Sequence, residues 1–409
     1  MREKTKYVIL LGDGMADLPV PELGNKTVLE FAKTPNMDFM AKNGICGITQ
    51  TVPAGMSPGS DTANLSVFGY DPAMYYTGRA PLEALSMDIE LAEGDVAFRC
   101  NIVDASGGIM NDFTSSHIDS RFTRIVIEEL AQNIKIKDIE FYPGVSYRNI
   151  VVWRNYPYDN IAQTTPPHDI QTKEVREFLP SGEGSETLKE IMSLSEEIIR
   201  SSKKIIDSRG LYKGNPHSVW LWGGGRKPSI ESLSSKYGIT GYTISAVDLI
   251  HGIGKAAGLS PLFVEGATGY LDTNYKGKVN ALAKGIGERD FVFLHVEAPD
   301  ESGHEGNIEH KLQAIEDFDS KVVGPVLEIM SKYPSFRILL MPDHPTPVKV
   351  RTHTGDPVLF CIFSDENSFM EERIKFAARS FDEQSASQTS LFVSKACNLL
   401  PIMINGKLS

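Results

Sequence analysis

The feature that most constrains this chain is an apolar run that ends in a carboxylate and an imidazole. Residues 336–341 have the composition of a short buried strand, and Asp343 and His344 follow it between two prolines. Consecutive side chains of a strand point to opposite faces, but both can converge on one site where the strand ends. The pair therefore suggests metal chemistry, although a lone Asp-His pair more often belongs to a capped turn with a surface histidine.

Two further apolar runs end in the same way. Residues 7–11 lead into an acidic residue, Asp13, and residues 291–296 lead into a segment with acidic residues and a histidine. Ligand sites of α/β sheets lie at the carboxyl ends of strands. A fourth segment, 351–356, adds another histidine before the next apolar run. We therefore expect six residues to gather at one edge of one sheet: Asp13, Asp300, His304, Asp343, His344 and His353.

The types of these ligands indicate which ions they would hold. Asp300 and His304 are four residues apart and would share a face of a helix, but Pro299 and Gly303 favour a loop there. Oxygen and imidazole ligands without cysteine suit manganese, zinc, iron, cobalt or magnesium, and a carboxylate-rich set favours manganese or magnesium. Six ligands are more than one ion needs, whereas two ions about 3.5 to 4 Å apart would use them in phosphoryl transfer.

Composition excludes several classes of protein. Apolar residues make up 41% and charged residues 23% of the 409 residues, as in soluble globular proteins of more than one core. The net charge of -12 disfavours a nucleic-acid partner. No stretch has the roughly 20 apolar residues of a membrane span, and the polar start at residues 1–4 leads into a strand rather than a signal-peptide pattern. The four cysteines lack Cys-x-x-Cys spacing and are expected to be packing residues, so we expect a cytoplasmic protein.

The origin of the candidate ligands predicts the domain organisation. The first and last thirds of the chain alternate strands and helices, whereas residues from roughly 90 to 235 differ in rhythm. Both ends of the chain supply ligands, so they must share one sheet. We expect an α/β fold in which residues 1–85 and 236–409 form one discontinuous metal-binding domain, with a smaller α/β domain, 86–235, inserted. Residues 307–332 are expected to form one long amphipathic helix.

Two serines compete as the nucleophile. Residues 55–59 match G-x-S-x-G, which would make Ser57 the attacking group of an esterase. However, Pro58 and Gly59 prolong the loop, and a helix is expected to start at Ser60. A helix N-terminus favours a bound phosphate, and a serine hydroxyl beside a cation is a nucleophile at neutral pH. The simpler interpretation of Ser60 is an N-cap.

The middle section carries polar loops of less specific meaning. His117 and His168 are, by type, more often surface or structural histidines. Residues 223–225 are three glycines that precede Arg226 and Lys227. They would either let the backbone approach an anion that the guanidinium binds, or form a flexible hinge.

Several motifs occur in the order of a known family. They are Gly12-Asp13-Gly14-Met15-Ala16-Asp17, Pro58-Gly59-Ser60-Asp61-Thr62-Ala63-Asn64 with Gly69-Tyr70-Asp71-Pro72, Ala298-Pro299-Asp300 with Gly303-His304, Pro342-Asp343-His344 and Thr352-His353-Thr354. Over nearly its whole length the chain resembles the archaeal-type, cofactor-independent phosphoglycerate mutases of the alkaline phosphatase superfamily. The resemblance implies an alkaline-phosphatase-like sheet sandwiched by helices.

The resemblance also implies a mechanism. A serine, Ser60, is phosphorylated by 3-phosphoglycerate and returns the phosphoryl group to the 2-hydroxyl, without 2,3-bisphosphoglycerate. Two divalent ions, manganese or magnesium with zinc or cobalt as alternatives, would be held by Asp300, His304 and His353 and by Asp13, Ser60, Asp343 and His344. Contacts to the substrate, a small phosphorylated metabolite, would come from His117, Arg148, His168, Asp169, Arg226 and Lys227.

Other functions remain open at this stage. Residues 112–118 and 165–169 resemble a bacterial branch of the same family that has been proposed to phosphorylate homoserine. A related phosphatase, a non-catalytic relative that binds metal or a phosphometabolite, and an esterase are further alternatives. The sequence leaves the metal, the phosphoryl acceptor and the oligomeric state undecided.

Overall fold

The chain forms two compact units, each with its own sheet. The computed structural model describes residues 4–365 and 369–408, so the polar start at residues 1–3 lies outside the described part. The first unit comprises Met1–Tyr76 and Ile230–Ser409, and the second comprises Thr77–Ser229. The boundaries differ from those expected after residues 85 and 235, because helix α5 (Arg79–Ser86) packs on the sheet of the second unit. Leu233 belongs to the first unit, where its N–H bonds to the carbonyl of Ala257.

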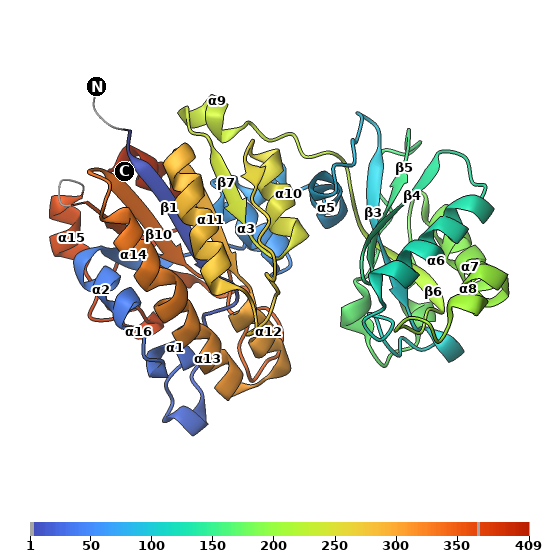
Figure 1. Ribbon diagram of the computed structural model, residues 1–409, viewed down its shortest axis with the longest axis horizontal. Coiled ribbons are helices and arrows are strands. Elements are labelled where there is room, and N and C mark those ends of the chain that lie inside the picture. The colour runs from blue at the N-terminus through green and yellow to red at the C-terminus, as the bar shows by residue number, and fades with distance from the viewer. Residues whose placement is uncertain (1–3, 366–368, 409) are drawn as a thin grey trace. The chain divides into compact units, whose positions relative to one another are not determined.

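The first unit is built on an eight-stranded, mostly parallel sheet (Figure 1). Its central strand, β1 (Lys6–Gly12), runs parallel to β9 (Phe291–Val296) and β10 (Phe336–Met341) on either side. The order is β12-β2-β11-β10-β1-β9-β7-β8, and β11 runs antiparallel to both of its neighbours. The remaining strands are β2 (Ile45–Thr49), β7 (Gly241–Ile244), β8 (Ser260–Pro261), β11 (Val358–Ser364) and β12 (Phe392–Val393).

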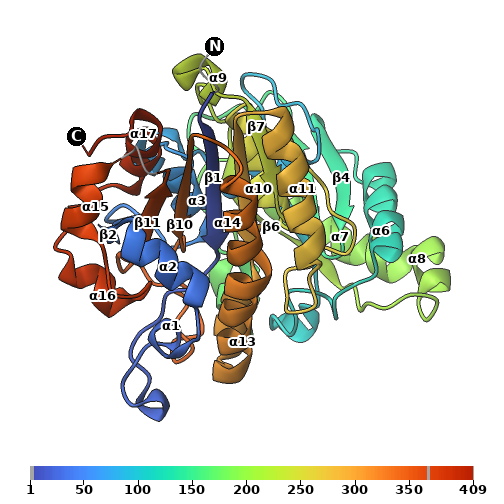
Figure 2. The same ribbon diagram turned by 60° about the vertical axis from the view of Figure 1, so that its left-hand side comes forward.

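Helices cover both faces of this sheet, which is why its central strands are continuously apolar. Figure 2 shows α2, α11, α13 and α14 in front of the sheet and α3 and α10 behind it. The helices of this unit are α1 (Val28–Phe31), α2 (Pro35–Asn43), α3 (Ser60–Val67), α4 (Pro72–Tyr75), α9 (Leu233–Tyr237), α10 (Asp248–Ala256), α11 (Tyr275–Glu288), α12 (Ala298–Glu305), α13 (Ile308–Phe318), α14 (Gly324–Met330), α15 (Met370–Phe376), α16 (Glu383–Gln388) and α17 (Leu399–Asn405). Within residues 4–365 and 369–408, no helix has the length and apolar content that a membrane span requires.

The long helix expected over residues 307–332 forms from Ile308 to Met330, with helical backbone angles at the junctions but not as a regular α-helix throughout. Between α13 and α14 the chain makes a π-helical turn at Asp319–Val323. The Asp319 carboxylate accepts hydrogen bonds from the N–H groups of Asn36 (3.3 Å) and Met37 (2.7 Å), at the start of α2. Thr34, the N-cap residue of α2, makes no side-chain capping bond. The wider turn therefore lets Asp319 cap a neighbouring helix.

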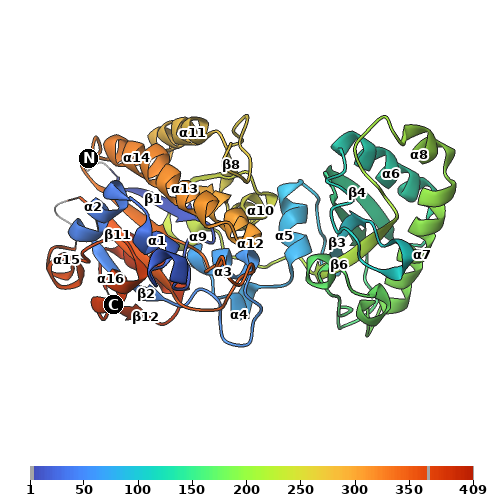
Figure 3. The same cartoon turned by 90° about the horizontal axis from the view of Figure 1, so that it is seen from below.

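The second unit has a four-stranded antiparallel sheet of order β4-β5-β3-β6. Its strands are β3 (Val96–Val103), β4 (Ile139–Val145), β5 (Arg148–Trp153) and β6 (Ser218–Gly225). Figure 3 shows α6 (Ser120–Asn133), α7 (Ser185–Ser201) and α8 (Lys203–Ser208) on one side of this sheet and α5 on the other. Each face has its own apolar cluster.

Candidate metal centre

The carboxyl ends of β1, β9 and β10 lie at one edge of the sheet. The register pairs Leu11 of β1 with Met341 of β10, and Gly12 with Val296 of β9, so the three strands end together. Two groups of ligand atoms, each lying within 4.8 Å of one another, collect beyond these ends: Asp13, Asp343 and His344, and Asp300, His304 and His353. The structure thus brings together all six residues expected from the sequence.

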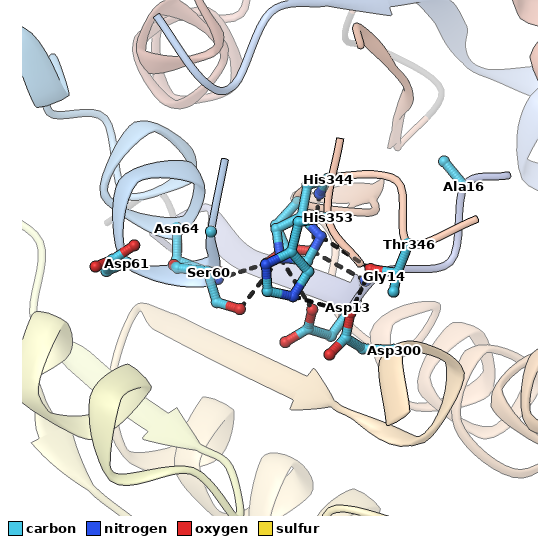
Figure 4. A network of polar contacts seen from close by, with 12 residues as sticks. Asp13, Gly14, Ala16, Ser60, Asp61, Asn64, Asp300, His344, Thr346 and His353 are labelled. Carbon is cyan, nitrogen blue, oxygen red and sulfur yellow. Dashed lines mark hydrogen bonds and ion pairs between the residues drawn. The ribbon is translucent and has the colours of Figure 1, made fainter. Parts of the chain in front are cut away.

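Ser60 lies beside the first group. It is the first residue of α3, where the sequence predicted a helix start, so the loop around Ser57 is not a nucleophile elbow. Its Oγ is 3.1 Å from Nε2 of His344, and Figure 4 shows the two side chains facing each other. One turn later, Asn64 donates to the carbonyl of Ser60 (2.9 Å) and to Oδ2 of Asp343 (2.8 Å). Sequence reasoning did not assign Asn64, although its spacing from Ser60 was a usable signal.

Asp300 and His304 lie on a helix, so the expected loop is wrong. Pro299 is in the first turn of α12, where a missing N–H removes no helical bond. A Cβ at Gly303 would lie 2.3 Å from the carbonyl oxygen of Thr346, so close packing, rather than chain flexibility, requires glycine there. The helix sets Oδ2 of Asp300 3.2 Å from Nε2 of His304.

The first group is a buried cluster of negative charge. The side chains of Asp343 and His344 are 0% exposed and that of Asp13 is 3% exposed. Burial, followed by the nearby carboxylates of Asp343 and Asp300, raises the pKa of Asp13 well above its usual value. Oδ1 of Asp13 is buried and has no hydrogen-bond partner. A cation would satisfy this oxygen and offset the repulsion between carboxylates, so the residues present fit a metal ion.

Hydrogen bonds around Thr346 determine which nitrogen of His344 carries the proton. The Thr346 hydroxyl donates to Oδ1 of Asp300, because an ionised carboxylate only accepts. The same hydroxyl oxygen, 3.2 Å from Nδ1 of His344, therefore accepts a hydrogen bond from that nitrogen. Burial lowers the pKa of His344 to about 4, so the ring is neutral. Its Nε2 then presents a lone pair toward Ser60 and the first group.

In the second group, the ligand atoms of Asp300, His304 and His353 lie within 4.8 Å of one another. Nδ1 of His304 donates to the carbonyl of Arg351, and its Nε2 lies 3.0 Å from Nε2 of His353. Although burial lowers the pKa of His304, its hydrogen bond to Asp300 and the charge of that carboxylate raise it to about 9. Without a metal, His304 therefore holds a proton in its hydrogen bond to Asp300. A divalent cation could replace that proton, so Asp300, His304 and His353 also fit a metal ion.

Gly14 closes the space between the two groups. It has a φ of +57°, and a Cβ there would lie 2.4 Å from Oδ1 of Asp300 and 2.6 Å from Oγ1 of Thr346. Its N–H donates to Oδ1 of Asp343 at 3.1 Å. A larger residue would therefore strain the backbone and separate the two groups.

In the second unit, three of the expected substrate contacts surround a set of aromatic rings. The His117 ring and the Arg148 guanidinium lie 6.4 and 5.4 Å from the centroid of Tyr147. The His168 ring lies 5.4 Å from that of Trp222, and Phe113 packs between His168 and Tyr147. Asp169 lies beside His168, 3.8 Å from its ring.

Arg226 is placed in a different cluster. Its guanidinium donates to the carbonyls of Gly94 and Tyr158 and lies 5.8 Å from the ring of Tyr156, while Lys227 is exposed. The three glycines before it are neither an anion loop nor a hinge but the end of β6. A Cβ at Gly225 would lie 2.2 Å from the carbonyl oxygen of Thr77, so close backbone approach explains glycine there.

Two arginines that share one carboxylate, the buried Arg99 and the partly exposed Arg79, were not singled out from the sequence. Glu83 lies 2.9 Å from Arg79 and 3.1 Å from Arg99, and both guanidinium groups lie over the Trp222 ring. Arg99 comes from β3, where alternate side chains face away from the main core. No local motif distinguishes it, because a single charged residue in an apolar strand is also found at edges.

An α/β sheet that gathers two groups of cation ligands beside a serine at a helix N-terminus defines a candidate metal-dependent phosphoryl-transfer protein. Residues 41–204 match the family model for 2,3-bisphosphoglycerate-independent phosphoglycerate mutase. A Geobacter sulfurreducens protein described as a probable member is 49% identical over 406 residues, which cover 98% of this chain and 100% of that protein. A Methanosarcina barkeri protein of that name is 45% identical over 408 residues, with 98% and 100% covered. This chain belongs to the 2,3-bisphosphoglycerate-independent phosphoglycerate mutase family.

Solved structures share the fold. The PH0037 protein from Pyrococcus horikoshii has a TM-score of 0.78 at 25% identity and covers 99% of both chains. The cofactor-independent phosphoglycerate mutase from Thermoplasma acidophilum has a TM-score of 0.63 at 23% identity and covers 98% of this chain and 99% of its own. The family resemblance and the α/β fold predicted from the sequence are therefore confirmed.

Proposed function

We propose that this chain interconverts 3-phosphoglycerate and 2-phosphoglycerate without 2,3-bisphosphoglycerate, which is the activity named for its relatives. The observation that supports the proposal most is that the Ser60 hydroxyl, at the start of α3, lies 3.1 Å from Nε2 of His344. The enzyme would act in the cytoplasm, in glycolysis, on a small phosphorylated metabolite rather than on nucleic acid or membranes.

Ser60 is the proposed nucleophile. Its Oγ attacks the phosphorus of 3-phosphoglycerate, so the Oγ–P bond forms as the bond between phosphorus and O3 breaks. The proton lost from Ser60 is balanced by the one that O3 gains. After the glycerate turns, its 2-hydroxyl attacks the phosphoserine, the Oγ–P bond breaks and Ser60 regains a proton. N–H groups at the start of α3 would contact the phosphoryl oxygens.

Two divalent cations are the proposed cofactors. Asp300, His304 and His353 would hold one, and Asp13, Ser60, Asp343 and His344 would hold the other. When bound, the cations would lower the pKa of the Ser60 hydroxyl and offset charge on the phosphoryl oxygens. Manganese or magnesium best suits these ligands, and zinc and cobalt also accept them.

The second unit is proposed to recognise the substrate anion. Arg79, Arg99 and Arg148 carry three positive charges against one carboxylate, Glu83, and guanidinium groups bind carboxylates and phosphates through paired hydrogen bonds. Ser115, Ser116 and His117 all have positive φ values, an unusual strain that often accompanies functional sites. As contacts to the substrate anion, these features favour four of the expected residues over Arg226 and Lys227. The four are His117, Arg148, His168 and Asp169.

The experiment that tests this function compares two serine variants. We expect Ser60→Ala to reduce interconversion of 3- and 2-phosphoglycerate more than about 1,000-fold, because the nucleophile is lost. Ser57→Ala, in the exposed loop before α3, is the matched control and should retain activity. Circular dichroism would check that both variants are folded. Full activity of folded Ser60→Ala would exclude the proposed mechanism.

Two further assays separate the alternatives. Wild-type protein incubated with 3-phosphoglycerate should carry phosphate on the peptide containing Ser60, as detected by mass spectrometry. Homoserine supplied with a phosphoryl donor should give no product. If homoserine were phosphorylated and phosphoglycerate were not, the acceptor would be homoserine and the mutase assignment would be wrong.

A further inference from the structure

A fully buried histidine outside both ligand groups contacts one of the candidate ligands. His295 lies on β9 and its side chain is 0% exposed. Its Nε2 lies 2.7 Å from Oδ2 of Asp13, and its Nδ1 lies 3.0 Å from Oγ of Ser245. The ring therefore bridges a candidate metal ligand and a hydroxyl that lies on the far side from the cation group.

The donor and the acceptor can be assigned for each hydrogen bond that runs from Asp13 through His295 to Ser245. A carboxylate that binds a cation is ionised and only accepts, so Nε2 of His295 would donate to Asp13 when the proposed cation is bound. A neutral imidazole carries one proton, so a ring that donates from Nε2 has a lone pair on Nδ1, 3.0 Å from Oγ of Ser245. Nδ1 then accepts from the Ser245 hydroxyl, whose oxygen accepts the N–H of Val247 at 2.9 Å.

Ser245 and His295 also bond to other buried side chains of the first unit. Nε2 of His251 donates to the carbonyl of Ser245 (3.1 Å), and its Nδ1 bonds to the hydroxyl of Thr243 (2.9 Å). The buried Lys278 donates to the carbonyl of His295 at 2.9 Å. Buried side chains therefore fix the backbone of both His295 and Ser245, the residues that carry the ring and the hydroxyl.

We infer that His295 and Ser245 are positioning residues for the cation held by Asp13, Asp343 and His344. By donating to Oδ2 of Asp13, His295 leaves Oδ1 as the oxygen for the ion, and that Oδ1 is the buried atom without a hydrogen-bond partner. Ser245 keeps the proton of His295 on Nε2. Neighbours that orient a metal ligand commonly change metal affinity about 10- to 100-fold. This inference rests on the proposed cation site.

The test replaces His295 by Gln or Asn, whose side-chain amides extend to different distances from the backbone. The side-chain nitrogen of Gln matches the position of Nε2 of histidine, so His295→Gln keeps a donor for Asp13. That of Asn matches Nδ1, so His295→Asn keeps polarity near Ser245 but cannot reach Asp13. Calorimetric titration with Mn²⁺ in a His304→Ala background, which lacks one ligand of the other group, reports the Asp13 group.

We expect His295→Asn to weaken Mn²⁺ binding at this group about 10- to 100-fold and His295→Gln to stay within a few-fold of the parent. Ser245→Ala should weaken it by an intermediate factor. Its matched control is Ser195→Ala in the second unit, where a buried serine likewise accepts a backbone N–H, from Val219, and Mn²⁺ affinity should not change.

Equal Mn²⁺ affinity of the Asn and Gln variants would overturn the inference, because only the donor to Asp13 distinguishes them. Equal weakening at both groups, measured without the background change, would indicate a general structural role and would also overturn it. If the wild type bound Mn²⁺ and interconverted the phosphoglycerates while His295→Asn bound Mn²⁺ equally well, only this inference would fail. If the wild type bound no Mn²⁺, the proposed function would fail with it.

Discussion

Neighbouring residues decide which nitrogen of each buried histidine carries a proton. The Thr346 hydroxyl accepts from Nδ1 of His344, and the Ser245 hydroxyl donates to Nδ1 of His295. The two rings consequently play opposite parts: one presents a lone pair to Ser60, and the other presents an N–H to Asp13. Histidine as a residue type indicates metal chemistry. Only the hydrogen bonds from Thr346 and Ser245 distinguish His344, a candidate ligand, from His295, a positioning residue.

Glu383 gives a pH-dependent prediction at the same scale. Its carboxylate accepts from the N–H of Asp17 (3.0 Å) and the hydroxyl of Thr27 (2.7 Å), and burial raises its pKa from 4.5 to about 7. Between these values the folded protein holds a proton that the unfolded chain has released, so the free energy of unfolding falls as pH rises from 4.5 to 7. Glu383→Gln should remove this fall, which is on the order of 2–3 kcal/mol.

Urea unfolding at pH 5 and pH 8 would measure the effect. The wild type should lose more stability than Glu383→Gln over this interval, and the variant should be the more stable protein at pH 8. The same pH dependence in both proteins would show that the Glu383 carboxyl is not the group that titrates.

At the scale of elements, two helices departed from their sequence signals. Pro299 and Gly303 favoured a loop, yet α12 forms because the proline lies in the first turn and the glycine faces the backbone of another segment. The apolar stripe between residues 307 and 332 predicted one helix, which forms but contains a π turn where Asp319 caps α2. In both cases a contact distant in sequence outweighed the local preference.

Lys311 connects three elements around the metal centre. It lies on α13, is 0% exposed and donates to Oδ2 of Asp17 (2.8 Å) and to the carbonyls of Ala16 (3.1 Å) and Thr346 (2.9 Å). Lys311→Met would leave the Asp17 carboxylate buried without its cation. We expect a loss of about 3–5 kcal/mol in the free energy of unfolding, measured with urea.

Lys321→Met is the matched control for that prediction. Lys321 forms an ion pair with Asp317 at 2.8 Å but is 51% exposed, so its loss should change stability by less than about 1 kcal/mol. If both variants lost the same amount, the buried ion pair would contribute no more than a surface pair.

At the scale of the whole molecule, each unit has its own core, and only the first contains the candidate ligands. The 3 tryptophans of the chain, Trp153, Trp220 and Trp222, all belong to the second unit. A cation that binds only the folded state stabilises the unit that holds it. Chelation with EDTA should therefore lower the melting temperature of the first unit alone.

Two signals recorded during heating would distinguish the unfolding of the first unit from that of the second. Far-UV circular dichroism should show a transition that shifts down on chelation, by several degrees if the ions contribute about 2–4 kcal/mol. Tryptophan fluorescence should show a transition that does not move. A common transition, shifted equally in both signals, would show that the units unfold together.

The sequence by itself determined the α/β fold, the family and the residue types at the metal centre. These follow from hydrophobic periodicity, from ligand chemistry and from motifs in order along the chain, all of which are local properties. It also determined the start of α3 at Ser60, because a Pro-Gly pair before a serine is a local signal. The expected substrate contacts and domain boundaries were less well defined, since no local pattern distinguishes loop residues that meet in space.

The tertiary structure alone decided how these parts act on one another. His295 and Asp13 lie 282 residues apart in sequence and 2.7 Å apart in space, and no periodicity relates them. The same holds for Asp319 and the start of α2, and for Arg99 and Glu83. Strand register brings His295 to Asp13, and the packing of helices brings the other pairs together. Both depend on packing over a whole unit rather than on any single segment.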